Sequence, residues 1–324
     1  MTTTEFKVSD SSDFDNDVRL ISHGVEAISQ GIHAIGVMYD EHSLDPKSQE
    51  NIRGYGESLD YRVNALSHIV AAFRDEFNRT QQWVLSAHEQ DLKEKRSYYP
   101  RMPHLKRAEE QLTVHLDSLI FHTISAFDYA GHMLLYMAKT AEKHKTNDWD
   151  ALHRICNNKD SWLHGSHLAI AVRRVGDNYV QRLQHYRGRL IHKEKDHHSV
   201  HIVYNAESSA RIIMKSSEKL KRTFQKIFAH EGDYSTKVFI TWFVSKSLIE
   251  LANVLFAISK DILSDSHFAK NIQEPKGNKG FSIVIAGPGG RALPVSDSQW
   301  RGHRAKIVEF AALAGLANEL DISS

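Results

Sequence analysis

The chain has 324 residues, of which 41% are hydrophobic and 25% are charged, and its formal net charge is +1. This composition is typical of a globular protein that buries a full hydrophobic core, and it excludes collagen-like and low-complexity chains. The single cysteine, Cys156, excludes an internal disulfide and fits a reducing compartment. No apolar run follows a basic stretch at the N-terminus, so we expect no signal peptide and a cytoplasmic protein.

The small net charge hides an uneven distribution of charged residues. Residues 1–47 contain nine acidic and three basic side chains. We expect residues 1–17, which are polar and acidic, to form a disordered arm. Residues 173–198 contain seven basic side chains, three acidic ones and four histidines. This basic window favours a polyanionic ligand, although a solvated basic face has the same composition.

Residues 18–100 carry two apolar stripes with steps of three and four residues, over 18–39 and 52–84. Such stripes predict two helices, each with one apolar face. Pro46 separates the stripes and suits the first turn of the second helix. The sequence therefore predicts an N-terminal helical segment that packs on the rest of the chain.

Residues 101–265 have the pattern of a helical bundle that contains one hairpin. Apolar periodicity predicts long helices over about 105–143, 161–192 and 234–263, with a short helix or loop at 148–157. Asp160 and Ser161 offer an N-cap for the second of the long helices. The period then changes, and residues 200–214 contain two runs of β-branched residues around a polar turn. This change predicts a β-hairpin over 200–214.

The most apolar stretch, residues 238–258, contains two charged side chains, Lys246 and Glu250. A charge at the centre of a bilayer costs about 2.5–3.5 kcal/mol on insertion scales. We therefore expect a buried core helix here and no membrane partner. Residues 266–324 predict a second hairpin around a Gly-Pro-Gly-Gly turn and a last helix over about 299–320. The expected fold is mainly α: an elongated helical bundle with a small hairpin after residue 192.

One segment, residues 186–192 (YRGRLIH), carries the residue types of a chemical site. Arg187 and His192 are five residues apart at the predicted end of a helix, on adjoining faces, where both side chains can reach one phosphate. Histidine has a pKa near neutrality and can move a proton. Arginine carries a permanent, planar charge that stabilises a crowded phosphate. Cleavage of RNA by its own 2′-hydroxyl needs both of these functions and no metal.

A helical bundle whose helix ends in Arg187, four further residues and His192, with a hairpin directly after it, resembles the HEPN superfamily. Residues 116–129 (LDSLIFHTISAFDY) also resemble the upstream core helix of one bacterial branch of that superfamily. The resemblance covers roughly residues 105–265 and implies a HEPN-like four-helix core. Residues 1–100 and the C-terminal tail lie outside it.

The resemblance implies a metal-independent endoribonuclease that works as a homodimer, without a cofactor, and leaves a cyclic phosphate end. It implies a toxin–antitoxin, abortive-infection or other defence role, with an antitoxin or regulatory protein as a further partner. Carried over, Arg187 would hold the scissile phosphate and His192 would transfer the proton. The RNA-binding candidates in the basic window are Arg189, Lys193, Arg182 and Tyr186. Tyr186 either stacks on a base or packs inward.

Two alternatives stay open. Many active HEPN members carry a polar residue after the arginine, whereas this chain has Gly188, so a non-catalytic module that binds RNA, a nucleotide or a protein is the second hypothesis. Glu194 and His197 have a Glu-x-x-His spacing, which holds metal when both residues share a helix face. They fall in an expected loop, so we expect no metal.

Overall fold

The computed structural model describes residues 11–42, 46–94, 102–138, 148–192, 196, 198–204, 210–228, 235–264, 284–286 and 292–321. Its helices are α1 (Ser11–His42), α2 (Pro46–Glu94), α3 (Met102–Met137), α4 (Trp149–Asn157), α5 (His167–Val175), α6 (Gln181–His192), α7 (Glu218–Phe224), α8 (Thr236–Leu263) and α9 (Val295–Leu313). Its strands are β1 (Ser199–Tyr204), β2 (Ala210–Lys215), β3 (Val284–Ala286) and β4 (Ala292–Pro294). The fold is therefore mainly helical, as the apolar stripes predict.

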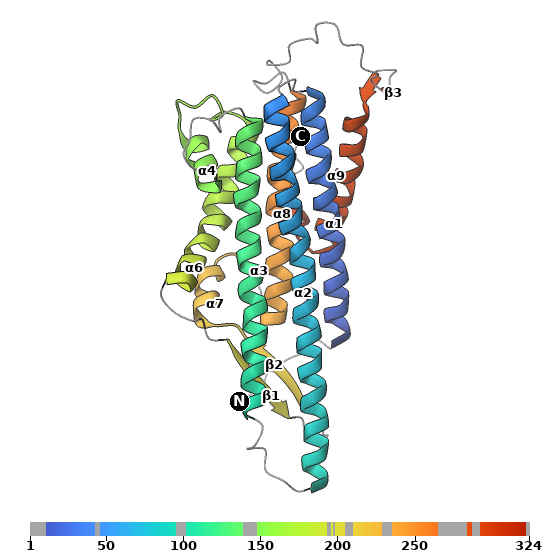
Figure 1. The fold of residues 1–324 in the computed structure, drawn as a ribbon, viewed down its shortest axis with the longest axis vertical. Coiled ribbons are helices and arrows are strands. Elements are labelled where there is room, and N and C mark those ends of the chain that lie inside the picture. The colour runs from blue at the N-terminus through green and yellow to red at the C-terminus, as the bar shows by residue number, and fades with distance from the viewer. Residues whose placement is uncertain are drawn as a thin grey trace.

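The long helices form an elongated bundle in which α8 is the central element (Figure 1). It contacts α1, α2, α3, α5 and α9, and nearly all of its side chains are buried. By length and composition α8 could cross a membrane, and 83% of its most apolar window is buried inside the fold. Its charged residues are paired, because Lys246 bonds both Glu250 and Glu319. The prediction of a buried core helix is confirmed, since a helix that is apolar on all sides needs neighbours on all sides.

The two hairpins form where the sequence predicts them. β1 and β2 pair antiparallel, with Val200 opposite Met214 and Ile202 opposite Ile212. β3 and β4 form a second short antiparallel pair before α9. Gln81 of α2 fastens the edge of β2, because its amide donates to the Ala210 carbonyl and accepts from the Ile212 N–H. The first hairpin is thus held against the C-terminal half of α2 and the N-terminal part of α3 (Figure 1).

Two sequence expectations need correction. The predicted disordered arm is wrong from Ser11 onward, because α1 begins there and Phe14 is buried against Phe73, with ring centroids 6.1 Å apart; residues 1–10 lie outside the described part. The single helix expected over 161–192 is also wrong. The observed helical segment begins at His167, with Ser166 as its N-cap. A π-helical turn, Gly176–Val180, divides this segment into α5 and α6.

Candidate functional site

Helix α6 holds the segment that the sequence analysis singles out, and its inner face is set by two buried side chains. Leu183 and Tyr186 are buried, while Arg187 lies at the edge of that face with 38% of its side chain exposed. A helix advances about 100° per residue, so Arg182 and Arg189 share one flank and Arg187 occupies the other. The structure therefore does not bring the candidate RNA-binding residues Arg182 and Arg189 together with Arg187.

Arg187 is held against α3. Its guanidinium carbon lies 5.6 Å from the centroid of the Phe121 ring, a cation–π distance. Its Nη1 atom is 4.0 Å from Oδ2 of Asp128, which is a loose ion pair. The Nε atom of Arg187 is buried and has no hydrogen-bond partner among the described residues. The guanidinium is thus positioned by an aromatic face, while its hydrogen-bonding capacity stays largely unused.

Asp128 is the acidic neighbour of Arg187, and it titrates unusually high. Burial and, after it, the nearby Asp148 carboxylate raise the pKa of Asp128, whereas Arg187 and the Trp149 N–H lower it, and the net pKa is about 6. The backbone of α4 can approach so closely because residue 131 is glycine. A Cβ at Gly131 would lie 2.6 Å from the Trp149 nitrogen. Asp128 belongs to the segment 116–129, but its charged neighbours come from separate helices, so the sequence alone does not single it out.

His192 is the last residue of α6, and its side chain lies outside the described part of the structure, as does Lys193. Helix geometry places its Cα about 140° around the axis and about 7.5 Å along it from that of Arg187. This is the same separation as between Arg182 and Arg187, so His192 and Arg187 lie on different flanks of α6, and helix geometry alone does not give the adjoining faces that the spacing suggested. That their side chains meet at one phosphate stays a prediction.

Of the two alternatives for Tyr186, the structure has the inward-packed one, so the candidate RNA-binding role of its ring is wrong. Its side chain is 1% exposed, and its hydroxyl donates a hydrogen bond to Oδ2 of Asp196. The hydroxyl of Ser217 donates to the same oxygen at 2.6 Å. Burial and the Asp196 carboxylate both raise the pKa of Tyr186, so the phenol stays neutral. Tyr186 instead ties α6 to the start of α7.

Asp196 also belongs to a cluster with Ser217 and His198, but this Ser–His–Asp cluster is not a nucleophilic site. The Ser217 N–H donates to Nδ1 of His198 at 3.2 Å, and His198 lies 3.9 Å from the Asp196 carboxylate. All three residues are buried, and Ser217 serves as the N-cap of α7 through its bond from the Leu220 N–H. A substrate cannot reach the Ser217 hydroxyl, so the cluster is a structural anchor.

Other chemistry-bearing residues have structural surroundings and show no sign of a reactive site within the described part of the chain. The ring of His132 stacks on Tyr55 with centroids 4.7 Å apart. Burial raises the pKa of the Cys156 thiol to about 12, so this cysteine is not a reactive thiolate. Within the described residues, no group of three or more His, Cys, Asp or Glu side chains gathers closely enough to hold a metal ion. Glu194 and His197 lie outside that part of the chain.

Comparison with known proteins adds no relative: no family model matches the chain, and no match is found among the curated proteins or the solved structures. Function must therefore be argued from the residues themselves.

Proposed function

We propose that this protein is a metal-independent endoribonuclease of the HEPN type that acts in a toxin, abortive-infection or other defence role. The observation that carries the proposal is the environment of Arg187. A partly exposed guanidinium rests on the Phe121 ring, with only a loose ion pair to Asp128, on the helix that ends at His192. Such a group can bind a phosphate without first breaking a strong ion pair.

In the proposed reaction, the ribose 2′-hydroxyl attacks the adjacent phosphorus and the bond from phosphorus to the 5′ oxygen breaks. The products are a 2′,3′-cyclic phosphate and a 5′-hydroxyl end. Arg187 stabilises the extra negative charge of the phosphorane, and His192 moves the proton between the attacking and leaving oxygens. Positioned charge of this kind is often the largest single contribution to catalysis.

The test uses the purified full-length chain and a labelled single-stranded RNA in EDTA. The wild type should cut the RNA to cyclic phosphate ends, and RNA with a 2′-deoxy sugar at the cut position should resist. Arg187→Ala and His192→Ala should each lower the rate at least about a hundredfold, whereas Arg301→Ala, on the exposed face of α9, should not change it. Equal cleavage by the wild type and Arg187→Ala would refute the proposal.

The second candidate is a non-catalytic module that binds RNA, a nucleotide or a protein partner. Gly188 favours it, because glycine has no side chain that could support Arg187, and the space beside it is not filled by another residue within 4 Å. Under this candidate, RNA binds without being cut, and its affinity falls steeply with salt, since phosphate contacts release counterions. A homodimer belongs to the first candidate, and light scattering of the purified protein would measure it.

A further inference from the structure

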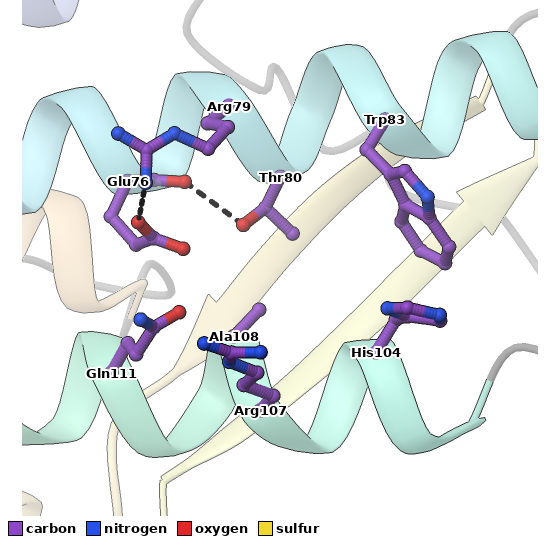
Figure 2. Close-up of a pocket in the computed structure, with 8 residues that line it drawn as sticks. All are labelled: Glu76, Arg79, Thr80, Trp83, His104, Arg107, Ala108 and Gln111. Carbon is purple, nitrogen blue, oxygen red and sulfur yellow. Dashed lines mark hydrogen bonds and ion pairs between the residues drawn. The ribbon is translucent and has the colours of Figure 1, made fainter.

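A cavity lies between α2 and α3, at the end of the bundle that carries the first hairpin (Figure 2). Its volume is about 300 Å³. Glu76, Arg79 and Trp83 line it from α2, and His104, Arg107 and Gln111 line it from α3. Figure 2 shows Glu76 and Trp83 pointing from α2 toward α3, and His104 and Gln111 pointing back from α3, with the strands of the hairpin behind.

The hairpin fixes the two walls of this cavity. Gln81 of α2 bonds β2 in both directions, at 2.8 and 2.7 Å, and Glu109 of α3 accepts a hydrogen bond from the Val200 N–H of β1 at 3.2 Å. Apolar packing adds to this, because Trp83 and Leu105 pack against the small core formed around the hairpin. The cavity is therefore preformed, and a ligand does not have to order it.

The cavity has an excess of positive charge. Nη1 of Arg79 lies 2.7 Å from Oε2 of Glu76, in an ion pair whose arginine side chain is 73% exposed. Arg107 is exposed and makes no ion pair or hydrogen bond with any described residue. One guanidinium is thus uncompensated, and the other is held only by a solvent-screened contact. Two arginines that line one cavity can bind a phosphate group, because a planar guanidinium forms bidentate hydrogen bonds with phosphate oxygens.

An aromatic wall stands beside these cations. The rings of Trp83 and His104 lie 5.2 Å apart between centroids, at 41°, and together bridge α2 and α3 (Figure 2). Aromatic faces next to arginines are the combination that binds a nucleobase and its phosphate. The Gln111 amide and the Glu76 carboxylate, which is 9% exposed, add hydrogen-bonding groups for a sugar or a base edge.

We infer that this cavity binds one nucleoside phosphate unit, with the base against Trp83 and His104 and the phosphate between Arg107 and Arg79. The unit is either a free nucleotide or one nucleotide of a single-stranded RNA. The site is separate from the Arg187 environment, since Arg107 and Phe121 are about 21 Å apart along α3. The inference goes beyond the proposed ribonuclease and does not depend on it.

The experiment titrates the full-length chain with adenosine monophosphate, ribose 5-phosphate and a five-nucleotide oligoadenylate, measured by calorimetry. It is carried out in the Arg187→Ala background, so that the RNA stays intact and loss of cleavage cannot be mistaken for loss of binding. The test variant is Arg107→Gln, which changes an exposed side chain without described contacts and should fold normally. Lys106→Gln, one residue away on α3 and outside the cavity lining, is the matched control with the same change of charge.

Adenosine monophosphate should bind, ribose 5-phosphate should bind at least about tenfold more weakly, and Arg107→Gln should weaken nucleotide binding about tenfold. Lys106→Gln should leave it unchanged. Equal affinities for the mononucleotide and the oligonucleotide identify a free-nucleotide site, whereas a tenfold or larger preference for the oligonucleotide, lost in Arg107→Gln, identifies an RNA site. If neither adenosine monophosphate nor the oligoadenylate binds, the inference is overturned, and so it is if Arg107→Gln and Lys106→Gln lose affinity equally.

Discussion

Replacing Gly131 by alanine should destabilise the protein, although alanine is the better helix former. Gly131 lies inside α3 where the start of α4 crosses it. An added Cβ would lie 2.6 Å from the Trp149 nitrogen and 2.7 Å from the Asp148 carbonyl carbon. Both are backbone atoms, so no change of side-chain rotamer can relieve the contact. The helix α4 itself must move away from α3.

Two opposing effects set the size of the change. Glycine to alanine in a helix interior stabilises by about 0.5–1 kcal/mol. Overpacking that shifts the backbone costs about 1–3 kcal/mol. The shift also weakens the bond from the Trp149 N–H to the Asp128 carboxylate, which holds that group near Arg187. The net expectation is a loss of roughly 1–2 kcal/mol in the free energy of unfolding.

Urea denaturation measures this loss, with Gly188→Ala as the matched control. Both glycines lie inside helices, but a Cβ at Gly188 would meet nothing within 4 Å. Gly188→Ala should therefore stabilise by about 0.5–1 kcal/mol. If Gly131→Ala gains stability as Gly188→Ala does, the close approach of α4 to α3 is not real and the account of the raised Asp128 pKa fails with it.

Two further predictions concern the same region. Because the pKa of Asp128 is raised to about 6 in the folded protein, folding favours its protonated form, and stability should fall as pH rises from about 4 to about 6. Asp128→Asn cannot titrate and lacks this loss. Between pH 4 and pH 7 its free energy of unfolding, measured by urea denaturation, should rise by about 1–3 kcal/mol relative to that of the wild type. A difference between variant and wild type that does not change with pH would contradict the raised pKa. Tyr186→Phe removes the bond to the buried Asp196 and should cost about 1–2 kcal/mol in the free energy of unfolding, measured by urea denaturation. An unchanged free energy of unfolding in Tyr186→Phe would contradict the stabilising role of that buried bond.

The sequence by itself predicted most of the long helices and both hairpins of this protein. Apolar residues at steps of three and four predicted α1 and α2, and the paired runs of β-branched residues predicted β1 and β2. These are local signals, because a helix or strand with one buried face carries apolar residues at a regular spacing along the sequence. The same local logic placed Arg187 on α6, with His192 as its last residue.

Only the tertiary structure decided which residues meet. Helix α1 starts at Ser11 because Phe14 packs on Phe73 of another helix, and nothing in the acidic segment itself signals that contact. Tyr186 at a helix end is compatible with base stacking or with burial, and the position of Asp196 selects burial. Arg187 likewise acquires its neighbours from α3, and the cavity beside Arg107 exists only between α2 and α3. Periodicity states which face of a helix is buried, whereas a site depends on which other helix covers it.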